Sequence, residues 1–212
     1  MDDNKKIGNV SEEDIELAKS AEPDDLKDKK PVSLVDEILE WAESFVFAMF
    51  VIVLLFTFFF RIVLVDGPSM NNTLIDGDRL IISHINYTPE RGDIVVVNSY
   101  EINKTIIKRC IGVAGDTVRI DYNSNTVTVN GEKISNDTNK ETMIDTGLFD
   151  TDYMVEDGVY EYVVPEGTIF VLGDNRNHST DSRAKVSFVK LENILGHAVF
   201  RLYPFESFGK IE

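Results

Sequence analysis

A long apolar segment near the N-terminus is the feature that most constrains this chain. Phe45–Phe60 contains no charged residue and only one polar residue, Thr57, and apolar residues resume after Arg61 and continue to Val65. A membrane-spanning helix needs about 20 apolar residues, and an arginine near its end can reach the lipid headgroups. A buried helix of a soluble domain is the alternative, but a run without a polar face suits lipid better. We therefore predict a transmembrane helix over residues 41–65.

The segment before this helix is hydrophilic and acidic. It is too long for the charged region of a cleaved signal peptide, so we expect the helix to be retained as an anchor. Residues 1–40 are predicted to form a disordered, acidic, cytosolic tail. Lys27, Lys29 and Lys30 favour a cytoplasmic N-terminus, which would put residues 66–212 outside the plasma membrane.

The charge and cysteine content exclude several classes of function. The 212 residues carry a net charge of −16. A nucleic-acid-binding protein needs a basic face, so we expect no nucleic-acid partner. Cys110 is the only cysteine of the sequence, so neither an intramolecular disulfide nor a cysteine metal cluster can form.

Residues 66–212 show the pattern of a mainly β domain. Short runs rich in β-branched residues alternate with turn signals such as Asn130-Gly131. Such a pattern indicates a sandwich or a closed barrel. Residues 117–168 are poorer in motifs and are expected to form a subdomain or insertion, with a polar loop over 132–150. The expected strands are 79–82, 94–97, 105–111, 117–120, 126–129, 168–172 and 197–202.

Ser69, shortly after the apolar segment, is a candidate nucleophile. A serine hydroxyl is weakly nucleophilic until a neighbouring base takes its proton. The three histidines, His84, His178 and His197, have no acidic residue at a telling spacing. We interpret them as ordinary structural or surface residues.

Lys108 is the alternative base. A lysine acts as a base only when it is neutral, and lowering its pKa from about 10.4 to roughly 7–8 requires burial in apolar surroundings. Lys108 lies within the apolar run Thr105–Ile111, which could supply that burial. A lysine on a strand is more often a solvated outward residue, and the motifs around it decide between the two interpretations.

Four sequence blocks follow the apolar segment in a fixed order, and together they resemble the type I signal peptidases. One block would be weak support, but four blocks in order after one span are specific. The single span before the serine is similar to the Gram-positive bacterial type. The blocks are Ser69-Met70 with Thr73-Leu74; Arg91-Gly92-Asp93; Lys108-Arg109 with Gly112 and Gly115-Asp116; and Gly173-Asp174-Asn175-Arg176 with Ser179, Asp181, Ser182 and Arg183.

The resemblance implies a role for each matching residue. Ser69 would be the nucleophile and Lys108 the general base, and Ser179 would hydrogen-bond the lysine amine and orient it. The family uses no metal and no cofactor, so none is expected here. The residues implied to support the site structurally are Gly173, Asp174, Asp181 and Arg183.

The resemblance also implies a fold and a substrate. The fold would be built of antiparallel sheets around a groove. The substrates would be preproteins, cut after Ala-x-Ala sites at the outer membrane surface, downstream of the secretion translocon and in contact with membrane lipid. An extended peptide would pair with the domain as an added strand, and small pockets would exclude large side chains. We expect Val63, Val65, Ile106 and Ile107 to line this groove.

Three positions depart from the family pattern. Gly67 replaces a hydroxyl-bearing residue that donates to the oxyanion in some members, so that task would fall to backbone N–H groups, including that of Ser69. Asn72 and Ala114 stand where proline is common and remove no catalytic group.

Other classes of function compete with this reading. A self-cleaving Ser/Lys repressor would need a DNA-binding domain and no span. A catalytically silent relative that assists assembly of surface pili would lack Ser69 or Lys108, and eukaryotic relatives carry histidine in place of the lysine. A membrane-anchored β module for adhesion would require all four blocks to be coincidental. We therefore expect a membrane-bound serine endopeptidase of the Ser/Lys type.

Overall fold

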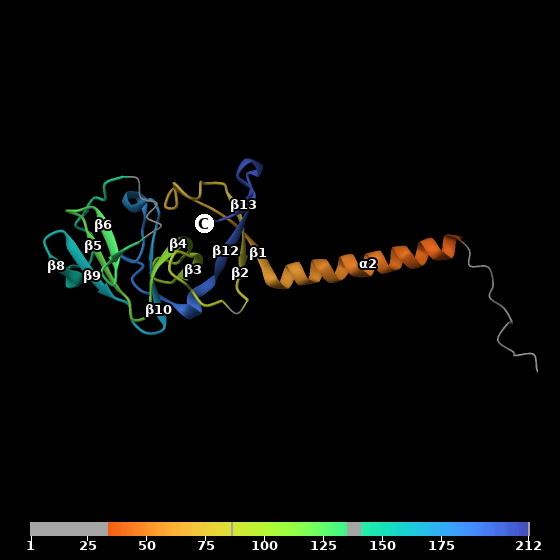
Figure 1. The fold of residues 1–212 in the computed structure, drawn as a ribbon, viewed down its shortest axis with the longest axis horizontal. Coiled ribbons are helices and arrows are strands. Elements are labelled where there is room, and N and C mark those ends of the chain that lie inside the picture. The colour runs from red at the N-terminus through yellow and green to blue at the C-terminus, as the bar shows by residue number, and fades with distance from the viewer. Residues whose placement is uncertain (1–33, 86, 135–140, 212) are drawn as a thin grey trace, which may run out of the picture. The chain divides into compact units, whose positions relative to one another are not determined.

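The computed structural model describes residues 34–85, 87–134 and 141–211. Residues 1–33 of the disordered tail predicted over residues 1–40 lie outside them, as does part of the polar loop expected over 132–150. The chain divides into two parts, residues 1–51 and Ile52–Glu212, and the second contains both sheets (Figure 1).

Helix α2 (Leu34–Phe59) is 26 residues long. Its segment Glu37–Phe59 is long and apolar enough to cross a membrane, which is consistent with a single-pass membrane protein. The prediction of a helix over residues 41–65 is wrong at both ends. The helix begins within the predicted tail, so residues 34–40 are helical, and it ends six residues before Val65.

The helix ends where a strand begins. β1 (Phe60–Leu64) pairs antiparallel with β2 (Arg79–Ser83), so that Ile62 lies opposite Ile81. This pairing supplies the backbone hydrogen bonds that a longer helix would have supplied, and β-branched side chains suit a pleated strand. Val63 also packs against the buried cluster that contains Val65 and Leu80. Residues 60–64 therefore belong to the β domain rather than to the helix.

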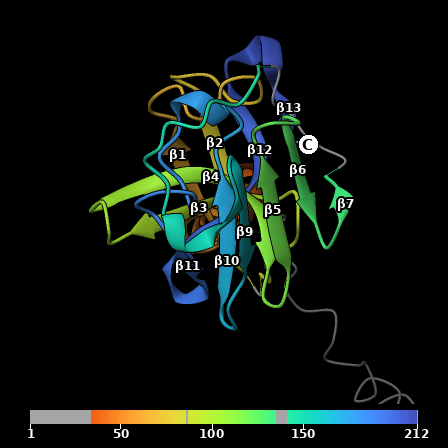
Figure 2. The ribbon, with the colours of Figure 1, turned by 90° about the vertical axis from the view of Figure 1, so that its left-hand side faces the viewer.

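In the described part of the chain, eight strands form the larger sheet. Their order is β1-β2-β12-β3-β4-β10-β11, with β13 paired to β12, and the pairings are antiparallel (Figures 1 and 2). The end strands β1 and β11 do not pair with each other, so this sheet is open and not a closed barrel. The strands not yet bounded are β3 (Ile94–Ser99), β4 (Lys104–Val113), β10 (Thr168–Leu172), β11 (Val189–Lys190), β12 (Ile194–Tyr203) and β13 (Gly209–Lys210).

Five described strands form a second, smaller antiparallel sheet, in the order β7-β6-β5-β9-β8. All five fall within residues 117–168, the region predicted to be poor in motifs. The prediction of a mainly β domain of antiparallel sheets after one apolar helix is confirmed. The strands are β5 (Thr117–Asp121), β6 (Thr126–Val129), β7 (Glu132–Lys133), β8 (Met154–Glu156) and β9 (Val159–Val163), and short 3-10 helices are η2 (Thr151–Tyr153), η3 (Arg176–His178), η4 (Leu191–Asn193) and η5 (Phe205–Ser207).

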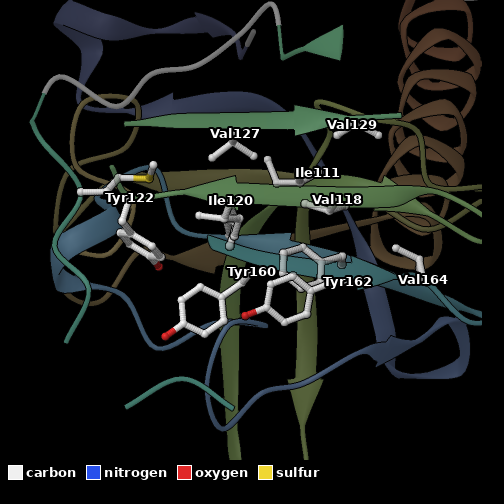
Figure 3. Close-up of a cluster of buried hydrophobic side chains, with 12 residues drawn as sticks. Ile111, Val118, Ile120, Tyr122, Val127, Val129, Tyr160, Tyr162 and Val164 are labelled. Atoms are coloured by element: carbon white, nitrogen blue, oxygen red, sulfur yellow. The ribbon is translucent and has the colours of Figure 1, made fainter. Parts of the chain in front are cut away.

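The two sheets share one hydrophobic cluster. Ile111, Phe170 and Leu172 come from the larger sheet, and Val118 and Tyr162 are among the residues from the smaller one. Figure 3 shows Ile111, Val118 and Tyr162 in this cluster. These five side chains are at most 3% exposed. Burial on this scale fixes the smaller sheet against β4 and β10, the strands that continue into the candidate site.

Gly112 on β4 allows the close approach of these two sheets. A Cβ atom at this position would lie 2.7 Å from Val118 Cγ2 and 3.2 Å from Val164 Cγ2. Both distances are shorter than ordinary carbon–carbon contacts, so a side chain here would push the smaller sheet away from β4.

We expect Gly112→Ala to destabilise the full-length protein by about 1–3 kcal/mol, because overpacking a filled core displaces its neighbours. In a thermal melt of the detergent-solubilised protein this corresponds to a loss of about 2–4 °C per kcal/mol. Val118→Ala should recover part of this loss when combined with Gly112→Ala, since it removes the methyl group in the way. Purely additive losses in the double variant would contradict this explanation.

Candidate active site

Ser69 lies in the loop that joins β1 to β2. The loop folds back on itself: Asn71 N–H donates to the Pro68 carbonyl at 3.0 Å, and Leu74 N–H donates to the Met70 carbonyl at 2.8 Å. The side chains of Met70 and Leu74 are buried in one hydrophobic cluster. This burial holds the intervening turn in place and leaves Ser69 half-buried at its start.

Two of the departures from the family pattern have a positive φ in this loop. Gly67 has φ +93°, and its N–H donates to Asp76 Oδ1 at 2.8 Å. Asn72 has φ +88°, in the turn closed by the hydrogen bond from Thr73 N–H to the Met70 carbonyl at 3.1 Å. A proline ring holds φ near −65°, so proline could not adopt this conformation at position 72.

Lys108 reaches Ser69 from β4. The pairing of β4 with β3 sets Lys108 opposite Val95. The lysine amine donates to Ser69 Oγ at 2.7 Å and to the Ile107 carbonyl at 2.9 Å. Lys108 is only 3% exposed, so this amine is largely removed from water.

Burial lowers the pKa of Lys108 from its ordinary value to about 8. The negative charges of Asp181 and Asp174 act in the opposite direction and raise this pKa, but burial has the larger effect. With a pKa of 8, about a tenth of the lysine is neutral at pH 7. A neutral amine at hydrogen-bond distance from a serine hydroxyl can accept its proton.

Ser69 and Lys108 line a pocket of about 350 Å³. One wall is the first half of β4. Because β10 pairs with β4 only from Arg109 to Val113, the edge of residues 104–108 that faces away from β3 has no partner strand in the described part of the chain. The structure brings together at this pocket the residues expected to line the groove, which are Val63, Val65, Ile106 and Ile107.

Gly173 and Ser179 lie against the nucleophile. A Cβ atom at Gly173 would lie 2.5 Å from the carbonyl oxygen of Ser69 and 2.2 Å from Ser179 Oγ, so only glycine fits. The Ser179 hydroxyl is buried, but it makes no hydrogen bond to Lys108. The structure therefore places Ser179 near the nucleophile without the contact to the lysine that the resemblance implies.

Asp181 and Arg183 form a buried ion pair. Arg183 Nε donates to Asp181 Oδ1 at 2.8 Å, and Nη2 donates to Oδ2 at 2.9 Å. Burial alone would raise the pKa of Asp181, but the charge and hydrogen bonds of Arg183 outweigh it and hold this pKa below its usual range. Asp181 also accepts from Gly173 N–H at 3.0 Å, and Arg183 donates to the Arg176 carbonyl at 2.6 Å. The pair thereby fixes both ends of the loop 173–183.

A second buried ion pair connects this loop to β4, and it was not predicted from the sequence. Arg109 donates to the two carboxylate oxygens of Asp174 at 2.9 and 2.7 Å and to the Gly92 carbonyl at 2.7 Å. The Thr73 hydroxyl donates to the same carboxylate at 2.5 Å. Arg109 follows Lys108 on the strand and so points to the opposite face. A buried arginine needs an acidic partner, so the apolar run around Arg109 could have indicated a buried ion pair. The run does not indicate that the partner is Asp174.

The three histidines take no part in this site. His84 and His178 are exposed, and His197 stacks on Tyr87 with ring centroids 4.1 Å apart. None of the three lines the pocket that contains Ser69. Over residues 34–85, 87–134 and 141–211, no group of three or more His, Cys, Asp and Glu could hold a metal ion.

Comparisons with known proteins identify the family. The family model for "Signal peptidase, peptidase S26" matches residues 38–203. Signal peptidase I of Bacillus licheniformis is 32% identical over 190 residues, which cover 88% of this chain and 100% of the relative. Signal peptidase I T of Bacillus subtilis is 36% identical over 174 residues, which cover 79% of this chain and 86% of the relative.

A crystal structure of a signal peptidase I from Enterococcus faecalis is also similar, with 30% identity and a TM-score of 0.38, covering 52% of this chain and 97% of that one. The family model extends from the apolar helix to the last residue of β12, and its match includes Ser69, Lys108 and the whole loop 173–183. On this match and on the 32% identity with a relative that is covered over its full length, the chain belongs to the signal peptidase family, peptidase S26.

Proposed function

We propose that this chain is a membrane-bound signal peptidase I that cleaves signal peptides from exported preproteins after Ala-x-Ala sites, with Ser69 as nucleophile and Lys108 as general base. Membership of the family supports the cleavage of signal peptides. The observation that carries the Ser/Lys mechanism is the 2.7 Å hydrogen bond from the buried Lys108 amine to Ser69 Oγ. The apolar helix α2 supports attachment to a membrane.

In this mechanism Lys108 moves one proton in each half of the reaction. Neutral Lys108 takes the proton of Ser69 Oγ as the oxygen attacks the scissile carbonyl carbon, and the carbonyl oxygen becomes an oxyanion that accepts from Ser69 N–H. Lys108 then protonates the leaving amine as the C–N bond breaks, which leaves an ester on Ser69. A water molecule deprotonated by the same amine hydrolyses the ester and restores the serine.

Three residues that match the family's motifs, Ser179, Asp181 and Arg183, have roles in the proposed mechanism that involve no proton transfer. Ser179 is the candidate for orienting the lysine amine, since its buried hydroxyl lies beside Gly173 and the Ser69 carbonyl. Asp181 and Arg183 support the loop that carries it. No step of the mechanism calls for a metal or a cofactor.

The substrate would bind as an extended strand along the unpaired edge of β4. Backbone groups of residues 104–108 are available for this pairing, which is the usual mode of β-strand addition. Val63, Val65, Ile106 and Ile107 would line the path of the peptide, and steric clash with these side chains would exclude large residues at the two alanine positions.

The small number of residues between the helix and the nucleophile favours cleavage close to the membrane surface. Ser69 follows Phe59, the last helical residue, by ten positions, and β1 occupies five of them. Lys27, Lys29 and Lys30 support a cytoplasmic N-terminus, with the catalytic domain on the outer side, downstream of the translocon. A signal peptide whose apolar core is still in the bilayer exposes its cleavage site at this level.

We expect Ser69→Ala and Lys108→Ala each to reduce cleavage of a preprotein with an Ala-x-Ala site by at least roughly 10³-fold, because the nucleophile and its base act as a unit. The assay uses the full-length protein in detergent with added lipid and identifies the new N-terminus by mass spectrometry. Lys190→Ala is the matched control: it removes an exposed lysine on β11 that does not line the pocket of Ser69, and it should cleave at the parental rate.

Two results would count against this proposal. Cleavage that survives in both variants would mean that other residues carry the chemistry. A folded parent protein that cleaves none of several preproteins would favour the catalytically silent relative that acts through a protein partner.

The pH dependence should report the pKa of Lys108. Only the neutral amine can take the proton of Ser69, so kcat/KM should fall about tenfold per pH unit below a pKa of about 8 and level off above it. Lys108→Arg should stay inactive at every pH tested, since a guanidinium does not lose its proton. A decrease of kcat/KM centred near pH 6.5 would instead indicate a histidine base.

A further inference from the structure

One backbone donor at the nucleophile has no partner among the residues that the structure describes. In the segment 67–69, Gly67 N–H donates to Asp76, and Pro68 has no N–H. Ser69 N–H donates to no group of the described residues. Since glycine at position 67 supplies no hydroxyl, stabilisation of an oxyanion by this segment depends on the direction in which Ser69 N–H points.

Asn175 holds the two carbonyl groups on either side of the serine. Its backbone N–H donates to the Ser69 carbonyl at 3.0 Å, and its side-chain Nδ2 donates to the Pro68 carbonyl at 3.2 Å. A single residue, 106 positions away along the chain, therefore fixes both peptide planes that meet at Ser69.

The side-chain hydrogen bond has a geometric consequence. In a trans peptide the C=O and N–H groups point in opposite directions. The peptide between Pro68 and Ser69 is trans, because the cis bond of the described residues is at Tyr203-Pro204. Drawing the Pro68 carbonyl toward Asn175 therefore aims Ser69 N–H away from Asn175.

Asn175 is itself held firmly. The residues on either side, Asp174 and Arg176, are 0% and 2% exposed. Asp174 is bound by Arg109, and Arg176 Nε donates to the Gly173 carbonyl at 3.0 Å. A loop fixed at these points can transmit its position to the turn that carries Ser69.

We infer that Asn175 is a positioning residue for the oxyanion hole: its two donors set the peptide plane from which Ser69 N–H binds the developing oxyanion. This inference rests on the proposed function, and no proton or bond changes at Asn175. Positioning by Asn175 would compensate for the missing hydroxyl at Gly67, because a site without a side-chain donor depends on the alignment of its backbone donor.

The test compares Asn175→Ala and Asn175→Leu with the parent, as full-length proteins in detergent with lipid and the same Ala-x-Ala preprotein. Leucine keeps the approximate shape of asparagine without its donor, and both variants retain the backbone N–H. We expect kcat to fall about 10- to 100-fold, somewhat less than for loss of a whole oxyanion donor. KM should stay within about twofold, because the ground state does not use this donor. The melting temperature and the pH limb near 8 should not move.

Asn177→Ala is the matched control from the same loop. Its side chain donates to the Thr142 carbonyl at 3.0 Å and accepts from Ile144 N–H at 3.0 Å, and it makes no hydrogen bond to residues 68 or 69. This variant should cleave at the parental rate.

A peptide aldehyde ending in Ala-x-Ala separates positioning from a general loss of structure. Ser69 Oγ bonds to the aldehyde carbon, and the former carbonyl oxygen takes the place of the oxyanion while Lys108 holds the serine proton. The matching peptide alcohol has no carbonyl and needs no oxyanion donor. In the Asn175 variants the inhibition constant of the aldehyde should rise by the factor lost in kcat/KM, and binding of the alcohol should be unchanged.

Each outcome bears on a different claim. If the parent cleaves and both Asn175 variants match it, the inference is wrong and the proposed function stands. Equal losses for the aldehyde and the alcohol, or a lowered melting temperature in both variants, would show a merely structural role and also overturn the inference. If the folded parent cleaves nothing, the proposed function fails, and the inference fails with it.

Discussion

The removal of Lys108 from water is the constraint on which the rest of this site depends. Burial lowers the pKa of the lysine to about 8, and one pKa unit corresponds to about 1.4 kcal/mol, so the fold tolerates a cost on the order of 3 kcal/mol for its charged form. That cost is present in full below pH 8, where both the folded and the unfolded chain carry the charge, and it disappears above the pKa of the unfolded chain. A fold without a use for a neutral amine would gain by leaving this residue in solvent.

Two buried ion pairs define the surroundings of that lysine. Arg109 with Asp174 and Arg183 with Asp181 are almost fully buried, and such pairs add little net stability compared with apolar packing. Their effect here is on geometry, because they fix the loop 173–183 against β4 and the turn of Ser69. Their carboxylates also raise the pKa of Lys108 against the effect of burial, which keeps the amine basic enough to take a proton from a hydroxyl.

The sequence predicts the local features of this structure better than the long-range ones. Most strands follow from β-branched runs, and β9 carries an alternating pattern, Val-Tyr-Glu-Tyr-Val, that could have been recognised. The end of the helix could not, because residues 60–64 are apolar apart from Arg61, which a span tolerates near its end, and only pairing with β2 makes them a strand. Motif order indicated Ser69 and Lys108, but the partners 65 positions apart in the pair Arg109–Asp174 depend on sheet register, which spacing does not encode.

Two of the positive-φ residues in the serine loop, Gly67 and Asn72, are explained by one local backbone conformation. Gly67 and Asn72 lie on either side of Ser69, and both occupy a region of φ that glycine and asparagine enter at low cost. A hydroxyl-bearing residue at position 67 and a proline at position 72 would each oppose this backbone, so the two departures from the family pattern are linked through one conformation. With glycine at position 67 the loop has no side-chain hydroxyl to donate to the oxyanion. In the proposed mechanism the backbone N–H of Ser69 donates instead. The position of Ser69 then depends on what holds its peptide planes, and in this chain that contact comes from the loop which the two ion pairs keep in place.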